Sequence, residues 1–389
     1  MEHRSASIYE GEKIMSKQLM LGNAALARGL YEAGCCVASS YPGTPSTEVT
    51  EEAAKYDAIY CEWAPNEKVA METAFGASMA GKRSFCGMKH VGLNVAADPL
   101  FTIAYTGVNA GMVICVADDA GMHSSQNEQD SRHYAEAAKL PMLEPSDSSE
   151  ALAFAKAAYE ISEKFDTPVI IKMCTRVAHS QSVVETGERE ERPTKPYVKN
   201  IQKNVMMPAN AKKRHYDVEK RMKALEEYAE TTPLNRIEWG GKELGIITSS
   251  TSYQYTKEVF GDSVSVLKLG MVHPLPEKLI RKFASNVKSL AVIEELDPVI
   301  ENYCKQLGLA VIGKDILPLE DEYSQNLIAA AFGRPVPEGK KLADAVPPRP
   351  PVMCAGCPHR GMFYLLSKHK LTVFGDIGFY TLGATAPVF

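Results

Sequence analysis

Alternating helical and strand patterns between residues 17 and 179 constrain the fold of this chain more than any other feature. Apolar residues recur with a helical period over 19–34, 67–80 and 149–163, and short apolar runs occupy 35–38, 83–88, 111–117 and 168–174. The run at 111–117 is apolar throughout, which is typical of a strand buried on both faces. Strands that alternate with helices form a parallel sheet covered on both sides. The predicted fold class is therefore α/β, with a doubly wound parallel sheet.

A second, shorter alternation covers residues 243–332, where strands are predicted at 244–248, 264–269 and 289–293. Residues 185–240 are rich in Lys, Glu and Arg without a strand pattern, which predicts a linker that packs across domains and holds one exposed helix at 217–228. A proline run at 347–351 precedes a helix near 362–367 and a strand at 371–374. The predicted organisation is an extension at 1–16, a domain at 17–184, the linker at 185–240, a domain at 241–335 and a third beginning at 346–389.

The charge and the cysteines bear on partners and compartment. The chain has 43 Lys+Arg and 48 Asp+Glu, a net charge of −5, and no basic stripe, which argues against a nucleic-acid surface. No apolar stretch reaches the roughly 18 residues of a membrane span, and the polar first residues do not resemble a signal peptide. Several of the nine cysteines, such as Cys115, lie in apolar runs and are typical of buried thiols. We expect a cytoplasmic protein that binds neither nucleic acid nor membrane.

The first loop of chemical interest covers residues 41–46 and follows the strand predicted at 35–38. Ligands of open α/β sheets bind beyond the carboxyl ends of strands. Gly43 would let the backbone approach a ligand closely, and Thr44 offers a hydroxyl donor. A proline-rich turn, in which Ser46 or Thr47 caps the next helix, is the ordinary alternative.

The second loop leads into the helix that begins at Glu67. This helix consists mainly of small residues, so a carboxylate packed there would lose solvation and have its pKa raised. Such a group suits a site that shares a proton with a ligand. The alternative is a first-turn glutamate that is favoured only by the helix dipole.

The third loop contains Cys354 and Cys357 separated by two residues, with His359 two positions later. Such a pair is typical of half a zinc site or of a redox pair. A closed zinc site needs four ligands, and no second pair of Cys or His follows, so we predict no metal site here. A loop in which Gly356 and Cys357 line a pocket is the competing interpretation.

Two further polar segments follow predicted strands. Asp118 and Asp119 could form a metal pair, although a polar loop on the ligand face explains them better. His123 belongs to the same loop. His90 either contacts a substrate or is a hydrogen-bonded structural histidine.

Together these motifs resemble the alpha subunits of the indolepyruvate ferredoxin oxidoreductases, which belong to the thiamine-diphosphate-dependent 2-oxoacid:ferredoxin oxidoreductases. The resemblance extends from Lys17 to the last residue. The matching segments are Leu21-Gly22-Asn23-Ala24-Ala25, Tyr41-Pro42-Gly43-Thr44-Pro45-Ser46, Asn66-Glu67-Lys68-Val69-Ala70, Asp119-Ala120-Gly121-Met122-His123-Ser124-Ser125-Gln126-Asn127, Cys354-Ala355-Gly356-Cys357-Pro358-His359-Arg360 and Gly375-Asp376-Ile377-Gly378.

The resemblance implies a role for each domain and for several residues. Residues 17–184 would be the pyrimidine-binding domain, residues 241–335 would resemble the transketolase C-terminal domain, and residues 346–389 would begin the diphosphate-binding domain. Glu67 would be the cofactor-activating glutamate, hydrogen-bonded to the pyrimidine ring, and Thr44 would contact the substrate. The implied cofactor contacts are Tyr41, Pro42, Gly43, Glu67, Gly356, Cys357, His359, Gly375 and Asp376, and the implied substrate contacts are Thr44, His90 and His123.

The resemblance also implies a reaction. The chain would act with thiamine diphosphate and Mg²⁺ to decarboxylate aryl 2-oxoacids such as indole-3-pyruvate oxidatively, giving acyl-CoA, CO₂ and reduced ferredoxin. Its partners would be a beta subunit, ferredoxin, CoA and the substrate, in an oligomer.

This sequence departs from the family pattern in two respects. Phe379 stands where family members commonly have Cys, and the magnesium–diphosphate motif and the two 4Fe–4S motifs are not found. We expect a truncated chain, with these motifs in the missing C-terminal region. Two alternatives remain open: a fragment that cannot bind the cofactor and only associates with partner chains, and a related thiamine-dependent decarboxylase that releases an aldehyde without oxidation.

Overall fold

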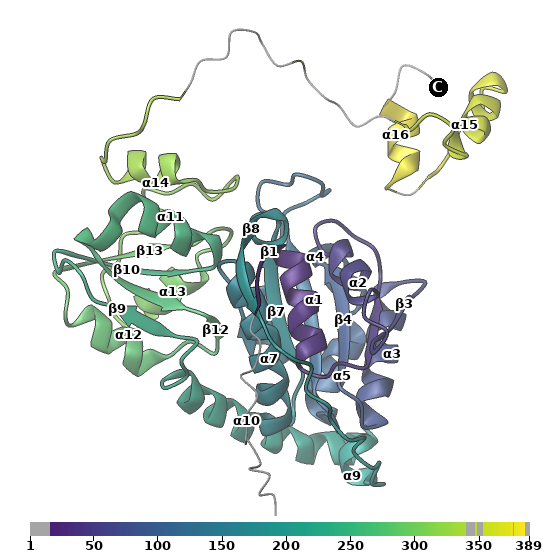
Figure 1. The fold of residues 1–389 in the computed structure, drawn as a ribbon, viewed down its shortest axis with the longest axis horizontal. Helices are drawn as coiled ribbons and strands as arrows, with labels where there is room; N and C mark the ends of the chain where they lie inside the picture. Colours follow the sequence, from purple (N-terminus) through teal and green to yellow (C-terminus); the bar gives the residue numbers. More distant parts are fainter. Residues whose placement is uncertain (1–15, 340–346, 348–352, 376, 386–389) are drawn as a thin grey trace, which may run out of the picture. The chain divides into compact units, whose positions relative to one another are not determined.

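The computed structural model describes residues 16–339, 347, 353–375 and 377–385 (Figure 1). The described residues form two compact units, which divide between Val336 and Pro337. Most of the predicted extension at 1–16, the start of the predicted segment at 346–389 and most of the proline run at 347–351 lie outside the described residues.

A seven-stranded sheet is the centre of the first unit. Its strands, in spatial order, are β12 (Met271–His273), β6 (Met142–Leu143), β7 (Val169–Cys174), β5 (Met112–Asp118), β4 (Ser84–Lys89), β2 (Val37–Ser40) and β3 (Tyr60–Trp63). All neighbours are parallel except β12, which pairs antiparallel with β6. The predicted α/β class with a parallel sheet is confirmed, and β4, β5 and β7 are buried along their whole length.

Helices cover both faces of this sheet, as a doubly wound fold requires. In β5, Val113 and Cys115 pack into one hydrophobic core, whereas Met112 and Ile114 pack into the other. The first core includes residues of α1 (Gly22–Glu32), α2 (Thr47–Ala53), α7 (Ser148–Phe165) and α8 (Thr175–His179). The second includes residues of α3 (Glu67–Met79), α4 (His90–Val95), α5 (Ala97–Thr106) and α6 (Arg132–Ala138).

The helix predicted over 19–34 is shorter than expected at both ends. Its first residues belong instead to β1 (Ser16–Leu21), which pairs antiparallel with β8 (Gln181–Thr186), a strand that the sequence did not predict. At the other end Gly34 has a φ of 75°, and the Cys35 N–H donates to the carbonyl of Leu30 at 3.0 Å. This closure of the helix uses the first residue of the strand predicted at 35–38, so β2 begins two residues later.

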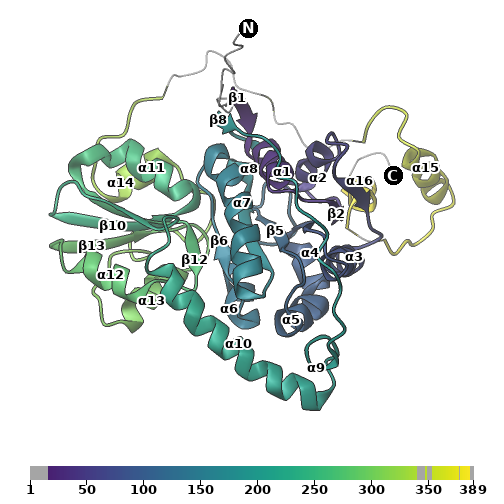
Figure 2. The same ribbon diagram turned by 60° about the horizontal axis from the view of Figure 1, so that its bottom comes forward.

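The segment predicted as a linker, 185–240, contains more regular structure than its sequence indicates. It holds α9 (Ile201–Asn204), α10 (Pro208–Ala229) and β9 (Arg236–Glu238). Figure 2 shows α10 as a long helix that runs from near α13 (Val299–Gln306) towards α5. The expectation of a wholly exposed helix is wrong, because Val218 and Leu225 are buried and Arg221 donates hydrogen bonds to the carbonyls of Ala104 and Asp166.

The second sheet has the spatial order β13 (Ser289–Ile293), β10 (Leu244–Ser249), β11 (Ser265–Leu269) and β9. Its three predicted strands are confirmed and are parallel, whereas β9 pairs antiparallel with β11. The absence of strand pattern in 185–240 therefore misled the prediction at Arg236–Glu238. The remaining helices of this half are α11 (Ser250–Phe260), α12 (Glu277–Ala284), α13 and α14 (Gln325–Ala331).

Buried charges join the two sheets where the carboxyl ends of their strands meet. Arg132 donates to Glu294 at 2.5 Å and to Asp130 at 2.6 Å. The Lys172 ammonium lies 3.0 Å from a Glu144 oxygen, and the other oxygen of Glu144 accepts from Ser249 at 2.6 Å. All of these side chains are buried. We call Asp118, Asp130, Arg132, Glu144, Lys172 and Glu294 the junction cluster.

The second unit contains α15 (His359–Lys368) and α16 (Phe379–Thr385). The helix predicted near 362–367 lies within α15. The strand predicted at 371–374 is wrong, because these residues have no regular structure. A strand needs neighbours for its backbone N–H and C=O groups, and no described segment of this unit provides one. A membrane-spanning helix needs a long apolar stretch, and no helix in the described part of the chain has one.

Candidate functional site

The carboxyl ends of β5, β4, β2 and β3 lie along one edge of the central sheet, because these strands are parallel neighbours. The loop at 41–46 follows β2, the residues before Glu67 follow β3, and His90 follows β4 directly. The loop that contains Asp119 and His123 follows β5. The fold thus brings four sequence-predicted segments to the edge where α/β sheets bind their ligands.

Glu67 is the first residue of α3, directly after the N-cap residue Asn66. The Asn66 side chain accepts a hydrogen bond from the Val69 N–H at 3.0 Å, which fixes the start of the helix. Burial raises the pKa of the Glu67 carboxyl, and a hydrogen bond to its own backbone N–H opposes this only in part. Among the described residues, no other side chain is hydrogen-bonded to it. The direction predicted from the small residues of α3 is confirmed.

The loop at 41–46 is held by its own side chains and by Asn23. The Gly43 N–H donates to Thr47 Oγ1 at 2.8 Å, and Ser46 Oγ donates to the Gly43 carbonyl at 2.9 Å. Neither hydroxyl caps α2, so the alternative of a simple capping turn is wrong. The Thr44 side chain is exposed, and in the described part of the chain its hydroxyl has no hydrogen-bond partner. Tyr41 and Pro42 are exposed beside it.

Lys89 and His90 end β4 and begin α4. His90 is buried, and its Nε2 lies 3.1 Å from the Asn127 carbonyl oxygen, so Nε2 carries the proton. Its Nδ1 is therefore an acceptor, and it is buried without a partner among the described residues. Lys89 donates to the Ser124 carbonyl at 2.6 Å, and burial lowers its pKa. His90 is thus hydrogen-bonded through one nitrogen, while its other nitrogen is a buried acceptor that no described residue satisfies.

Asp118 and Asp119 face different surroundings and do not form a metal pair. Asp118 accepts hydrogen bonds from the Ser131 backbone and hydroxyl, and burial raises its pKa. Burial opposes ionisation of Asp119, but hydrogen bonds from Ser125 and Thr175 lower its pKa overall. No group of three or more His, Cys, Asp or Glu side chains in the described part of the chain could hold a metal ion.

His123 is exposed, and its Nε2 lies 3.3 Å from a carboxylate oxygen of Glu322, a residue that precedes α14. The predicted substrate contact therefore lies beside a carboxylate of the segment that precedes α14.

The sequence did not assign a role to two residues of this edge. Asn23 is buried in α1 and donates to the Pro45 carbonyl at 2.7 Å and to Glu48 at 3.0 Å, so it fixes the loop at 41–46. In the sequence, a polar residue between the small residues Gly22 and Ala24 was the only sign that Asn23 has a specific hydrogen-bonding role. Gly92 lies in α4 beside the Glu67 carboxyl, and only the folded structure reveals this contact.

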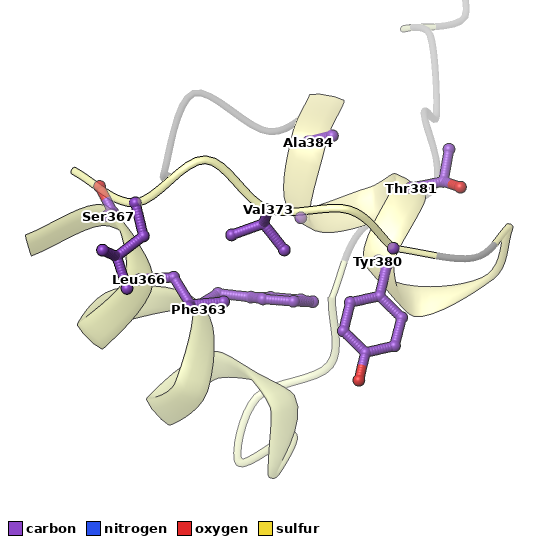
Figure 3. Close-up of a pocket in the computed structure, with 10 residues that line it drawn as sticks. Phe363, Leu366, Ser367, Val373, Tyr380, Thr381 and Ala384 are labelled. Atoms are coloured by element: carbon purple, nitrogen blue, oxygen red, sulfur yellow. The ribbon is translucent and has the colours of Figure 1, made fainter. Parts of the chain in front are cut away.

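The other predicted cofactor contacts belong to the second unit. Gly356 has a φ of 76° in an exposed turn, and Cys357 Sγ lies 3.4 Å from Nδ1 of His359. Gly375 is exposed, and Asp376 lies outside the described residues. A hollow of about 420 Å³ separates α15 from α16, with Phe363, Leu366, Val373 and Tyr380 among its lining side chains (Figure 3). This unit therefore presents apolar side chains rather than a charged centre.

The comparisons with known proteins agree with this picture. Residues 28–234 match the family model "Pyruvate flavodoxin/ferredoxin oxidoreductase, thiamine diP-bdg". Indolepyruvate oxidoreductase subunit IorA of Archaeoglobus fulgidus is 43% identical over 97% of this chain, and that of Methanothermobacter thermautotrophicus is 42% identical over 97%. The chain spans 65% of the length of each of these relatives.

Solved structures with low sequence identity have the same fold. The 2-oxoglutarate:ferredoxin oxidoreductase from Magnetococcus marinus aligns with a TM-score of 0.68 at 17% identity, over 82% of this chain and 65% of that chain. A split-gene transketolase aligns with a TM-score of 0.52 at 15% identity, over 80% of this chain and 95% of that one. The family model, which describes a thiamine-diphosphate-binding domain, matches more than half of the residues of this chain. The chain therefore belongs to the pyruvate flavodoxin/ferredoxin oxidoreductase family.

Proposed function

We propose that this chain is the cofactor-activating part of an oxidoreductase that decarboxylates aryl 2-oxoacids of the indole-3-pyruvate type. The observation that carries the proposal is the Glu67 carboxyl, which is half-buried at the carboxyl edge of the sheet without a side-chain partner among the described residues. The names of the IorA relatives support the substrate class. The domains proposed for the described residues are a pyrimidine-binding domain at 17–184, a linker and a transketolase-like domain at 241–335.

The residues at this edge fit the pyrimidine of thiamine diphosphate. Burial raises the pKa of this carboxyl, so a proton shared with a ring nitrogen costs less here than it would in water. The buried, unpartnered Nδ1 of His90 offers an acceptor in the next loop along the edge. When bound, the cofactor would supply an electron sink for the decarboxylation. Glu67 would hold and move the proton that activates it. We propose Gly356, Cys357, His359, Gly375 and Asp376 as further contacts for the cofactor, and we propose none of them as a metal ligand.

The loop at 41–46 would bind the substrate. The exposed hydroxyl of Thr44 is free to donate to the carboxylate or carbonyl oxygen of a 2-oxoacid. The backbone around Gly43 is fixed from both sides by Thr47 and Ser46, so this loop keeps its position as a substrate enters. Tyr41 and Pro42 would form the adjoining surface, and we retain His90 and His123 as proposed substrate contacts.

The proposed reaction balances with CoA and ferredoxin. The bond between the 2-oxo carbon and the carboxylate breaks and releases CO₂. Two electrons pass to two ferredoxin molecules, a thioester bond forms to CoA, and one proton is released. We place the 4Fe–4S clusters outside the described residues, which hold no suitable group of ligands. The chain would work in the cytoplasm as one subunit of an oligomer with a smaller beta subunit.

The test is reduction of ferredoxin by the assembled complex, dependent on both an aryl pyruvate and CoA. The expected result is activity that requires thiamine diphosphate and Mg²⁺ and that falls steeply in Glu67→Gln. Full activity of this variant would disprove the assigned role of Glu67. Release of an aldehyde without ferredoxin reduction would identify a non-oxidative decarboxylase instead. Failure of the complex to bind the cofactor would leave only the association of chains as the function.

A further inference from the structure

Gly92 occupies a helical position where the backbone does not require glycine. It lies in α4, is buried, and has no positive φ. An alanine would be favoured there by about 1 kcal/mol in helix propensity. The backbone conformation therefore does not explain why glycine occupies position 92. The explanation lies in the atoms that surround it.

A side chain at position 92 would first meet Glu67. A Cβ atom built on Gly92 would lie 2.4 Å from Oε1 of Glu67, 2.6 Å from its Cγ and 2.7 Å from its Cδ. These three are the nearest atoms, and all belong to one flexible side chain. Real Cβ atoms do not approach other atoms so closely, so the Glu67 carboxyl would have to leave its place.

A buried thiol is a second neighbour of the carboxyl. Cys86 lies on β4, is fully buried, and has its thiol pKa raised by burial, with a smaller contribution from the charge of Glu67. The half-buried carboxyl thus lies near a buried thiol and beside Gly92 of α4. Neither neighbour donates a hydrogen bond to it.

We propose that Gly92 is a positioning residue. Because it has no side chain, it leaves the space in which the Glu67 carboxyl lies, at the edge of the sheet where the parallel strands end. The proposal rests on the proposed function of Glu67 in cofactor activation. It predicts that even one methyl group at position 92 moves the carboxyl without disturbing the fold, because the three nearest atoms all belong to the Glu67 side chain.

The test is Gly92→Ala in the assembled complex, with Gly76→Ala as the matched control. Gly76 lies in the same helix as Glu67, and a Cβ there would meet nothing within 4 Å. We expect Gly92→Ala not to lower the melting temperature, to lower kcat about 100-fold as expected for a misplacement of about 1 Å, and to weaken thiamine diphosphate binding about tenfold in calorimetric titration with Mg²⁺. Gly76→Ala should leave kcat and cofactor binding unchanged, and its melting temperature should stay the same or rise, because alanine favours the helix.

A second comparison separates positioning from a general structural effect. In a Glu67→Gln background, Gly92→Ala should lower kcat by much less than 100-fold, because the group that it displaces is already disabled. Equal losses in both backgrounds would overturn the proposal, and so would wild-type cofactor binding and kcat in Gly92→Ala.

Two further outcomes are also decisive. If Gly92→Ala does not fold, Glu67→Ala should restore folding, since it removes all three atoms that the methyl group meets; failure to do so would overturn the proposal. Wild-type activity and cofactor binding in Glu67→Gln would instead disprove the proposed function of Glu67, whatever Gly92→Ala does.

Discussion

The two ends of one sheet edge differ in how their polar groups are satisfied. Where β5, β6 and β7 meet the second sheet, the charges of the junction cluster are buried and paired with one another. Beyond the ends of β2, β3 and β4, Thr44, Glu67 and Nδ1 of His90 have no side-chain partner among the described residues. Both regions follow parallel strands, and both are rich in polar residues.

The difference teaches that polar residues at strand ends do not by themselves mark a binding site. One part of the edge uses them to join two sheets, and there the two cations Arg132 and Lys172 each lie beside more than one carboxylate. In the other part, a buried nitrogen of His90 has no hydrogen-bond partner among the described residues, which costs free energy unless a ligand satisfies it. The absence of ion pairs, rather than the presence of polar residues, distinguishes the candidate site. The predictions below test this distinction.

Glu67→Gln should have the largest effect, and only on activity. Loss of a group that transfers a proton lowers turnover by about 10²–10⁴-fold. The free energy of unfolding should hardly change, because the carboxyl has no side-chain partner to lose. Ferredoxin reduction and chemical denaturation measure the two quantities. Glu72→Gln, an exposed position of the same helix, is the control and should change neither.

Arg132→Met should have the opposite profile. It leaves Asp130 and Glu294 buried without their cation, which costs about 3–5 kcal/mol in the free energy of unfolding. Arg281→Met breaks an exposed pair with Glu277 and an exposed hydrogen bond to the Leu307 carbonyl, and should cost less than about 1 kcal/mol. Equal costs in denaturant titrations would show that the junction cluster does not stabilise the unit.

Thr44→Val should weaken substrate binding without affecting stability. Loss of one hydrogen bond to a charged carboxylate costs about 1.5 kcal/mol, so the KM for the 2-oxoacid should rise by about tenfold. The melting temperature should not change, because the hydroxyl is exposed. The exposed Thr102→Val serves as the control. An unchanged KM in Thr44→Val would remove Thr44 from the substrate site.

Glu295→Gln should have the smallest effect and should depend on pH. Burial raises the pKa of Glu295, which accepts hydrogen bonds from the Tyr323 N–H and from Thr251. A raised pKa in the folded state means that the stability from this group is complete below the unfolded pKa and is lost as the pH rises through the folded pKa. Glu295→Gln should not show this loss. Parallel curves of unfolding free energy against pH would contradict the prediction.

The sequence predicted the buried part of the fold well and the exposed part poorly. The apolar runs that became β4, β5 and β7 were located within one residue, because a strand buried on both faces needs apolar residues throughout. β8 and β9 carry polar, half-exposed side chains, and their pattern does not differ from that of a loop. Their position depends on the partner strand, which lies far away in the sequence.

The candidate site shows the same division. Thr44 could be found because it follows a predicted strand, and Glu67 because it begins a predicted helix of small residues. The contact between Gly92 and Glu67, and the fixing of Pro45 by Asn23, result from approaches between elements that local patterns do not encode. The strand predicted at 371–374 failed for a related reason, since its pattern is apolar but its described surroundings offer no strand to pair with.

The placement of β12 means that the two halves of the first unit cannot be separated without exposing strand edges. This strand comes from the second half of the unit in sequence but pairs with β6 of the first sheet, while β9, from the segment between the halves, pairs with β11 of the second. One edge strand of each sheet therefore comes from a part of the chain outside the other strands of that sheet. Separating the halves would expose unpaired strand edges, which promote aggregation. The two halves are thus not interchangeable modules, and we expect them to melt in a single cooperative transition.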